Sequence, residues 1–226
     1  MAALSTSTWG DPAATKHVLL IHGITFSSRF WHHIAQKFAS RGKFHNQAVA
    51  EHAPDMPVSD AGYFVTAPDL LGHGSARCSS DYTVAALVEE LRPLLTAGGN
   101  DHPYDIVIGH SLGGVVAAAL FPFLKSSRPV RVVLVDPPFE MPPGSAASYK
   151  KLFGDMIGNP KTPEAYLKEF PLWTREDAIF FSTSIRLCNV ATTEAIMDVG
   201  LFILLVGLSS QDSSSKTTLG RFHTSC

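Results

Sequence analysis

The sequence predicts an α/β protein in which a mostly parallel central sheet is flanked by helices. Short apolar runs of strand length alternate along the chain with segments of helical spacing, and this alternation is typical of such a sheet. Residues 130–135 are rich in β-branched apolar side chains, which predicts a strand that is buried on both faces. Residues 106–108 form an apolar run that leads through Gly109–Gly113 into a stretch of small residues, which predicts a strand, a tight turn and a helix.

The first elements of the sheet are expected in the N-terminal part of the chain. Val18–Ile21 predicts a buried strand that ends at His22. Residues 30–39 repeat apolar side chains at helical spacing and predict an amphipathic helix. Residues 42–62 carry Gly, Pro, Asn and Asp without a period and predict a long surface loop, after which Tyr63–Ala67 predicts the next strand.

A second helix is predicted after Asp81, whose side chain can cap it. Its inner face repeats apolar residues at helical spacing, namely Val84, Leu87, Val88 and Leu91. Pro93 lies late in this pattern and is expected to kink or end the helix. The strand that leads into the glycine-rich turn is expected at Asp105–Gly109.

The chain is predicted to consist of a core at residues 1–138 and a helical lid insertion at residues 139–198. The second segment is rich in proline and bulky side chains, and its aromatic residues fit either the lining of a pocket or packing onto the core. Residues 199–208 are expected to return to the core as a late strand, and residues 209–226 to form a polar, disordered tail.

Length, composition and charge describe a globular chain. The 226 residues suit one large domain, with 45% hydrophobic and 17% charged residues and a mean hydropathy of +0.11. The formal net charge is −2, with 18 basic and 20 acidic residues spread along the chain, so no nucleic-acid partner and no polybasic membrane surface are expected. The N-terminus lacks the features of a signal peptide, and the longest apolar run, Val199–Leu208, is too short for a membrane span.

The spacing of cysteine and histidine predicts reduced thiols and no metal site. The three cysteines are scattered and odd in number, which favours reduced thiols and, with no signal peptide, a cytoplasmic location. His32 and His33 are neighbours on a predicted helix, so their side chains are expected to point in different directions, which disfavours a shared metal ion.

The pattern Gly-x-Ser-x-Gly at residues 109–113 indicates a reactive serine. At a strand-to-helix junction this pattern forces Ser111 into a strained turn and exposes its hydroxyl. The two glycines let neighbouring backbone approach where a side chain would clash. The N-terminus of the following helix directs amide donors toward the place where negative charge would develop. These features predict that Ser111 is a nucleophile.

Four motifs, in order along the chain, resemble those of the α/β-hydrolase superfamily in its lidded, single-domain form. They are Trp9–Pro12 before the first central strand, His22–Thr25 after it, Ala67–Ser75 after the next strand, and Gly109–Gly114 at the serine turn. The resemblance covers roughly residues 8–208, and the four motifs in register make it specific.

The resemblance implies a reaction and the residues that perform it. Ser111 would attack an acyl carbonyl, and the backbone N–H groups of Leu112 and Ile24 would hold the resulting oxyanion. A serine at this position argues against the branches that use an aspartate there, and it leaves acyl transfer or hydrolysis of an ester, thioester, amide or carbon–carbon bond. The implied partner is a small-molecule apolar acyl substrate, and the mechanism requires no cofactor.

The resemblance leaves the acid and the base of the catalytic triad open. The family order is serine, then acid, then histidine. Asp136 ends the predicted strand at 130–135 and Asp212 follows the late strand, so both compete for the role of the acid. His223 is the one histidine after Ser111 and the candidate base, although it follows Asp212 too closely for a further strand and helix. The alternative is that the family's last strand and helix are missing.

Two functions are therefore expected from the sequence. The first is a serine hydrolase that acts on an ester or related acyl bond of a small to medium apolar substrate. The second is an impaired or inactive α/β-hydrolase-fold protein whose pocket binds a ligand or partner. The remaining polar residues of the loop motifs are expected to shape turns rather than to react: His22, Asp69, His73 and His110.

Overall fold

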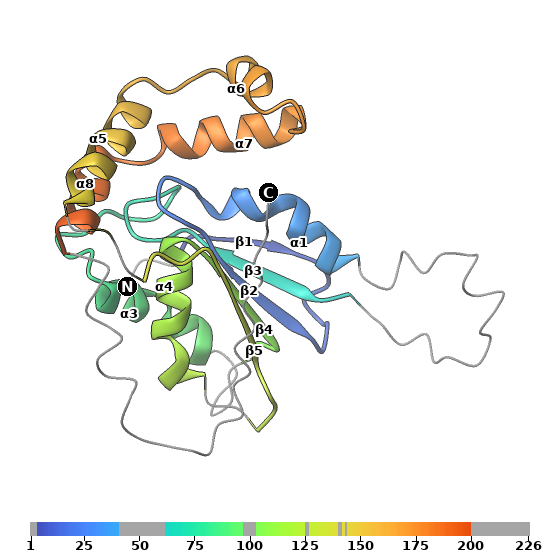
Figure 1. The fold of residues 1–226 in the computed structure, drawn as a ribbon. Helices are drawn as coiled ribbons and strands as arrows, with labels where there is room; N and C mark the ends of the chain where they lie inside the picture. Colours follow the sequence, from blue (N-terminus) through green and yellow to red (C-terminus); the bar gives the residue numbers. More distant parts are fainter. Residues whose placement is uncertain are drawn as a thin grey trace.

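The computed structural model has a central sheet with helices on both faces (Figure 1). It describes residues 4–40, 62–96, 103–124, 127–139, 142 and 144–199. The strands in these ranges are β1 (Thr6–Trp9), β2 (His17–Ile21), β3 (Phe64–Pro68), β4 (Ile106–His110) and β5 (Arg131–Val135). The helices are α1 (His32–Ala39), α3 (Val84–Thr96), α4 (Leu112–Ala119), α5 (Ser145–Gly158), α6 (Pro163–Glu169), α7 (Arg175–Arg186) and α8 (Val190–Val199), with two 3-10 turns, η1 (Ser28–Trp31) and η2 (Phe121–Phe123).

The described sheet is mixed, with the strand order β1-β3-β2-β4-β5. Strands β3, β2, β4 and β5 run parallel to one another, which confirms the predicted parallel centre. Strand β1 pairs antiparallel with β3 and was not predicted. Its four residues alternate between exposed and half-buried positions, so the segment lacks the continuous apolar run by which the central strands were found.

Strand β5 lies where it was predicted, but the prediction that it is fully buried is wrong. Among its residues only Val132 is buried, and Val135 is 42% exposed. In the described part of the sheet, β5 is the terminal strand and has β4 as its neighbour. A terminal strand is covered less completely than a central one, and the sequence of a strand does not reveal its position in the sheet.

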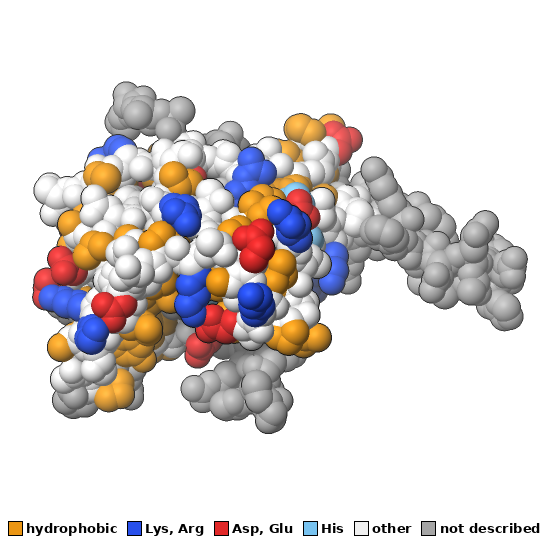
Figure 2. All heavy atoms as spheres, turned by 90° about the horizontal axis from the view of Figure 1, so that it is seen from above, with side chains coloured by type: hydrophobic (Ala, Val, Ile, Leu, Met, Phe, Trp, Pro, Cys, Tyr) orange, Lys and Arg blue, Asp and Glu red, His pale blue; other side chains and the backbone are white. Residues whose placement is uncertain are grey.

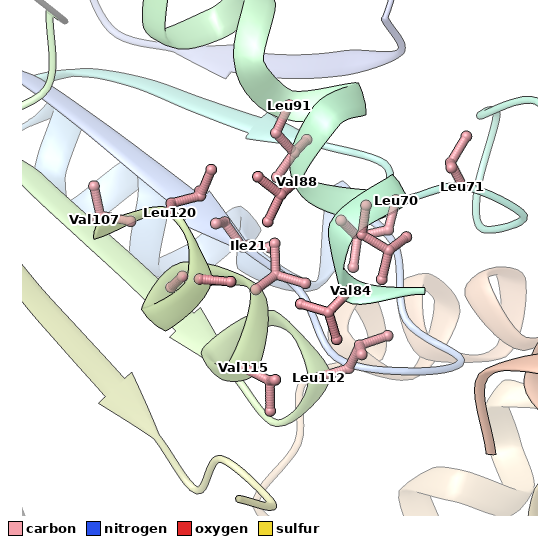
Figure 3. Packing of buried hydrophobic residues seen from close by; sticks show 14 of the residues in the cluster. Ile21, Leu70, Leu71, Val84, Val88, Leu91, Val107, Leu112, Val115 and Leu120 are labelled. Carbon is pink, nitrogen blue, oxygen red and sulfur yellow. The ribbon is translucent and has the colours of Figure 1, made fainter. Parts of the chain in front are cut away.

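The two faces of the sheet carry separate parts of the core. On one face, Leu19 and Ile21 pack with side chains of α3 and α4. On the other face, Val18 and Leu20 pack with Trp31 of η1 and Ala35 of α1. This division follows from the alternation of side chains along a strand. Figure 3 shows the first part of the core, where apolar side chains from both helices gather against the strands.

Helix α3 differs from its prediction at both ends. Thr83, rather than Asp81, caps the helix, because the Thr83 hydroxyl oxygen accepts a hydrogen bond from the Ala86 N–H at 3.1 Å. Asp81 instead accepts one from the Thr83 N–H at 2.8 Å and so holds the cap in place. Pro93 lies inside the helix without ending it, since Leu95 beyond it is only 5% exposed and packing holds the last turn.

Residues 30–39 were predicted as one helix and form two elements. The 3-10 turn η1 holds Phe30 and Trp31, and α1 begins at His32. Trp31 is buried at 3% exposure and anchors this turn to the sheet, so tertiary packing decides where the regular helix begins.

Helices α5–α8, at residues 145–199, are called the helical segment below; they lie together above the sheet and α1 in Figure 1. Tyr166, Ala178 and Ile185 form a small core of this segment, with Trp173 and Phe181 packed against them. These aromatic residues therefore pack with one another inside the segment, rather than onto the core as one of the two expectations had it. No helix among the described residues is long and apolar enough to cross a membrane.

Some predicted elements lie outside the described residues. These are the loop at 42–62 except for its last residue, the late strand at 199–208 beyond the end of α8, and the tail at 209–226. The boundary of the lid insertion at 139–198 stays a prediction.

Candidate active site

Ser111 lies in a sharp turn between β4 and α4. Its backbone has φ 52° and ψ −121°, a conformation that a side-chain-bearing residue rarely adopts. The Ser111 N–H donates to the carbonyl of Val135 on the neighbouring strand at 2.9 Å, and its own carbonyl accepts from the Gly114 N–H at 2.8 Å. The turn is thus fixed on both sides, and the serine lies at the end of the parallel strands.

The glycines of the motif allow this turn to pack closely. A side chain at Gly109 would place its first carbon 2.1 Å from the Gly113 carbonyl oxygen. A side chain at Gly113 would place its first carbon 2.2 Å from the Ile21 carbonyl oxygen. Both distances are far below contact distance to backbone atoms that cannot move aside. The sequence-based explanation of these two glycines is therefore supported by the geometry.

The loop after β2 lies directly against the serine. A side-chain carbon built on Gly23 would lie 3.1 Å from the Ser111 Cβ and 2.9 Å from the His110 Nδ1. Thr25 in the same loop has φ 64°, again a left-handed backbone at a residue with a side chain. Ile24 lies between these two residues and is 5% exposed. The two predicted oxyanion donors thus belong to elements that flank Ser111, since Leu112 is the first residue of α4.

His22 holds this loop to the next strand. The Leu70 N–H donates to Nε2 of His22 at 3.0 Å, so the ring proton is on Nδ1, which lies 2.8 Å from the Gly23 carbonyl oxygen. Burial, with the nearby His73, lowers the pKa of His22 to about 3. The imidazole is therefore neutral at physiological pH, and its two hydrogen bonds orient the loop rather than transfer protons.

Asp69 joins three further segments to the same loop. Its carboxylate accepts hydrogen bonds from the Ser28 N–H at 2.7 Å, the Ser75 N–H at 3.0 Å and the Ser5 hydroxyl at 2.9 Å. Burial alone would raise the pKa of Asp69, but these three bonds outweigh it and the pKa is lowered. Asp69 is thus a carboxylate at neutral pH. It links the end of this loop at Ser28 to Ser5 and to Ser75.

His73 completes this buried network. Its ring lies 5.3 Å from the ring of His22, and its Nδ1 lies 2.9 Å from the Leu71 carbonyl oxygen. Burial lowers the pKa of His73, so this ring is also neutral. The expectation that His22, Asp69 and His73 shape loops agrees with these contacts.

His110 directly precedes Ser111 and lies among aromatic rings. It stacks on Phe30 at 5.4 Å and contacts Phe26 edge-on at 5.7 Å between ring centroids. Its Nδ1 is buried without a hydrogen-bond partner. Burial lowers the pKa of His110, while the negative charge of Asp136 acts in the opposite direction.

The structure describes Ser111 and Asp136 of the predicted triad and does not describe the other two candidates. Asp136 follows β5, the strand next to that of Ser111, with φ 48° and an exposed side chain. Asp212 and His223 lie outside the described residues. The choice between the two acids thus stays a prediction, as does the role of His223.

The helical segment contacts the loop beside the serine through a serine pair that the sequence did not single out and through one of the segment's aromatic side chains. The Ser27 and Ser184 hydroxyl oxygens lie 2.6 Å apart, and the rings of Phe26 and Phe181 lie 5.3 Å apart. Both partners in the segment belong to α7. The only signal in the sequence was the helical spacing of apolar and small residues along α7, which does not reveal the surface that they face.

The expectation that His32 and His33 point apart is wrong. One ligand atom from each of these two side chains and from Glu176 lie within 4.8 Å of one another. The reason is that His32 and His33 begin α1, directly opposite the first turn of α7, so both rings lean toward the same acidic side chains. This cluster is the one group among the described residues that has the donor set of a metal site.

A strained serine turn at the end of parallel strands, faced by a glycine-containing loop, defines the α/β-hydrolase class of proteins. A sequence model of the Alpha/beta hydrolase family matches residues 18–213, and the chain belongs to this family.

Curated relatives match part of the chain. The lipase LipV of Mycobacterium tuberculosis is 36% identical over 129 residues, which cover 56% of this chain and 39% of LipV. The monoacylglycerol lipase of Mycolicibacterium smegmatis is 31% identical over 106 residues, covering 45% of this chain and 31% of that lipase. The matched region thus spans less than half the length of either relative.

Solved structures share the fold. The esterase EaEST of Exiguobacterium antarcticum superposes with a TM-score of 0.58 at 13% identity, covering 87% of this chain and 68% of the esterase. The thioesterase domain of the curacin biosynthetic pathway superposes with a TM-score of 0.53 at 20% identity, covering 79% of this chain and 60% of that domain. These similarities support the fold alone.

Proposed function

We propose that this chain is a serine hydrolase that cleaves an ester or related acyl bond of a small to medium apolar substrate. The observation that carries the proposal is the backbone of Ser111, with φ 52° and ψ −121°, pressed against the loop at Gly23. A side-chain-bearing residue in such a conformation costs on the order of 1–3 kcal/mol, and such strain is concentrated at functional sites. The family match and the lipases among the relatives support the reaction class.

The proposed reaction begins with attack of the Ser111 hydroxyl oxygen on the substrate carbonyl carbon. The serine proton passes to a base, for which His223 is the candidate, and the carbonyl oxygen becomes an oxyanion held by the N–H groups of Ile24 and Leu112. Collapse of this intermediate breaks the bond to the leaving group, which takes the proton from the base. Water then attacks the acyl-serine in the same manner, releasing the acid and restoring Ser111.

The buried loop network supports this proposal because it fixes the oxyanion donors before substrate binds. His22 bonds the loop to Leu70, and Asp69 bonds Ser28 at the end of the same loop. Donors held in place in this way stabilise developing charge without having to reorganise. His22 acts through this loop and is a positioning residue.

The apolar character of the substrate is proposed from the aromatic side chains that border the serine turn. Phe26 and Phe30 surround His110, the residue before the nucleophile, and Phe181 contacts Phe26 from α7. Aromatic surface beside a nucleophile favours apolar acyl or alcohol groups. The printed names of the two curated relatives, both lipases, agree with such a substrate.

The first experiment is intact-mass analysis after treatment with a fluorophosphonate, with Ser111→Ala in parallel. We expect a single adduct on the unaltered chain and none on Ser111→Ala, because only an activated serine reacts at an appreciable rate. Ser184→Ala is the matched control, since Ser184 lies nearby on α7 and should leave the adduct unchanged. Absence of an adduct on folded protein favours the alternative, a protein of this fold that binds a ligand without turnover.

The second experiment assigns the acid and the base. Turnover of a short-chain p-nitrophenyl ester is measured for His223→Ala, Asp136→Asn and Asp212→Asn. Loss of a triad acid is expected to lower kcat by roughly 10⁴-fold, and the other aspartate variant should retain near-normal turnover. Unchanged turnover in His223→Ala would exclude that histidine as the base.

A further inference from the structure

The first residues of α1 and α7 bring two histidines and two carboxylates together. Nε2 of His32 lies 3.5 Å from a Glu176 carboxylate oxygen, and Nε2 of His33 lies 3.8 Å from the other oxygen of the same carboxylate. Nε2 of His33 also lies 3.1 Å from Oδ1 of Asp177. We propose that this cluster binds one divalent transition-metal ion of the zinc type, with ligand atoms from His32, His33 and Glu176 and the fourth position of a tetrahedral ion left open.

The distances between the ligand atoms fit such an ion. Zinc lies about 2.0–2.2 Å from nitrogen and oxygen ligands, so atoms at the corners of a tetrahedron around it are about 3.3–3.6 Å apart. The two histidine–carboxylate separations, 3.5 and 3.8 Å, lie near this range, and the three ligand atoms all lie within 4.8 Å of one another. Because the Glu176 side chain is 50% exposed and that of His33 is 38% exposed, small side-chain rotations can close the remaining differences.

The donor set selects the class of metal. Imidazole nitrogen is a good ligand for zinc, copper and nickel, whereas magnesium and calcium prefer sites made of oxygen alone. The Glu176 carboxylate offsets part of the charge of a divalent ion, and the two imidazoles can bind while neutral. Zinc binding to this cluster should therefore be much tighter than magnesium binding.

Asp177, which contacts the ligand His33, is itself held by its neighbours. Oδ2 of Asp177 accepts hydrogen bonds from the Thr174 N–H at 2.8 Å and the Thr174 hydroxyl at 2.7 Å. Asp177 thus presents its second oxygen, Oδ1, 3.1 Å from Nε2 of His33, as a partner beside the ligands.

Trp9 holds His32 in the ring tautomer that cannot bind a metal ion through Nε2, and this provides a test of the proposal. The indole N–H of Trp9 donates to Nδ1 of His32 at 3.3 Å, so the ring proton of His32 lies on Nε2, facing Glu176. Metal binding through Nε2 moves that proton to Nδ1, where it meets the indole N–H, and the Trp9 bond must open. At 3.3 Å this bond is long and weak, so it lowers the affinity without preventing binding.

An ion at this site would join the core to the helical segment. His32 and His33 belong to α1 beside the sheet, and Glu176 and Asp177 belong to α7. Figure 2 looks down on this side of the molecule, where histidine and acidic side chains reach the surface near one another. The ion should therefore raise the stability of the whole chain by binding the folded state and not the unfolded one.

The test is calorimetric titration of the chain with ZnCl₂ and with MgCl₂ at neutral pH. We expect one zinc per chain and no binding heat with magnesium. Loss of a partner outside the ligand shell weakens metal binding about 10- to 100-fold, so His33→Ala and Glu176→Gln should each weaken it at least tenfold. His17→Gln is the matched control, a histidine on β2 outside the cluster, and should bind zinc normally.

A second titration shows whether the bound zinc is held by His32 and His33 or by other residues. Trp9→Phe removes the indole donor but keeps an aromatic ring, and it should tighten zinc binding severalfold if His32 is a ligand. Absorption of bound Co²⁺ reports the tetrahedral geometry and should be lost in His33→Ala. The proposal is overturned if the unaltered chain does not bind zinc, or if His33→Ala and Glu176→Gln bind it as tightly as the unaltered chain.

Discussion

The buried pair His22 and His73 and the surface pair His32 and His33 differ in how they use the same side chain. Both buried rings are completely inaccessible to solvent and have a proton position set by backbone groups. The surface rings are partly exposed and face carboxylates. Burial lowers the pKa of each buried ring, so these histidines are fixed structural groups. The surface pair keeps its nitrogens accessible to an added ligand.

The aspartates beside the two histidine pairs, Asp69 and Asp177, differ in the same way. Asp69 is 4% exposed and uses its carboxylate fully on hydrogen bonds inside the protein. Asp177 uses one oxygen on Thr174 and turns the other toward His33. Full internal use of polar atoms yields a rigid loop, whereas partial use leaves a site that can bind something else.

The largest expected effect is that of removing Asp69. Asp69→Ala leaves the N–H groups of Ser28 and Ser75 without their acceptor in a buried region, at about 1–3 kcal/mol for each lost partner. We expect the free energy of unfolding to fall by about 3–5 kcal/mol in urea denaturation. The control is Asp155→Ala, an exposed partner of Lys151, which should change it by less than about 0.5 kcal/mol.

The second expected effect is loss of stability in acid caused by the buried histidines. The unfolded chain binds protons near pH 6.5, whereas the pKa of His22 in the folded chain is about 3. Between these values the unfolded state carries more protons, so stability falls as the pH falls, by about 1.4 kcal/mol per pH unit for His22. Burial lowers the pKa of His73 as well, which acts in the same direction.

Urea denaturation at pH 7.0, 6.0 and 5.0 measures this slope. His22→Asn should flatten it, even if the variant is less stable at every pH, because the slope reports the titrating group. A steep slope that persists in His22→Asn and in His73→Asn would contradict the assignment.

A smaller effect is expected for the cap of α7. Thr174→Ala removes the hydroxyl that accepts from the Asp177 N–H at 3.1 Å, and it should cost about 1 kcal/mol in the free energy of unfolding. Thr162→Ala removes the equivalent cap of α6 and should cost a similar amount. Of the two variants, only Thr174→Ala should also weaken zinc binding, because Asp177 then loses its orientation.

The smallest effect is expected for His33 in the absence of metal. His33→Ala removes a partly exposed pairing with Asp177, which is worth about 0–1 kcal/mol. Thermal unfolding in the presence of a chelator should therefore be nearly unchanged, and a difference from the unaltered chain should emerge when zinc is added. A large loss of stability in the chelator would instead assign His33 to the packing of the fold.

The sequence predicted the parts of the site that depend on local geometry. Gly109 and Gly113 indicated the sharp turn, and their backbone contacts confirm the reason for both. The strands β2, β3 and β4 were found because central parallel strands are continuously apolar. The cap of α3 was misplaced by two residues, since Asp81 and Thr83 are both suitable caps and only the fold shows which one meets Ala86.

What the sequence determined by itself is the class of fold and the position of the strained turn at Ser111, because both follow from short-range patterns of apolar residues and glycine. The tertiary structure decided which distant groups meet. It placed Asp69 among Ser5, Ser28 and Ser75, and it brought Glu176 to His32 and His33. These contacts join segments that are far apart in the chain, so their energies depend on packing and burial that no local pattern records.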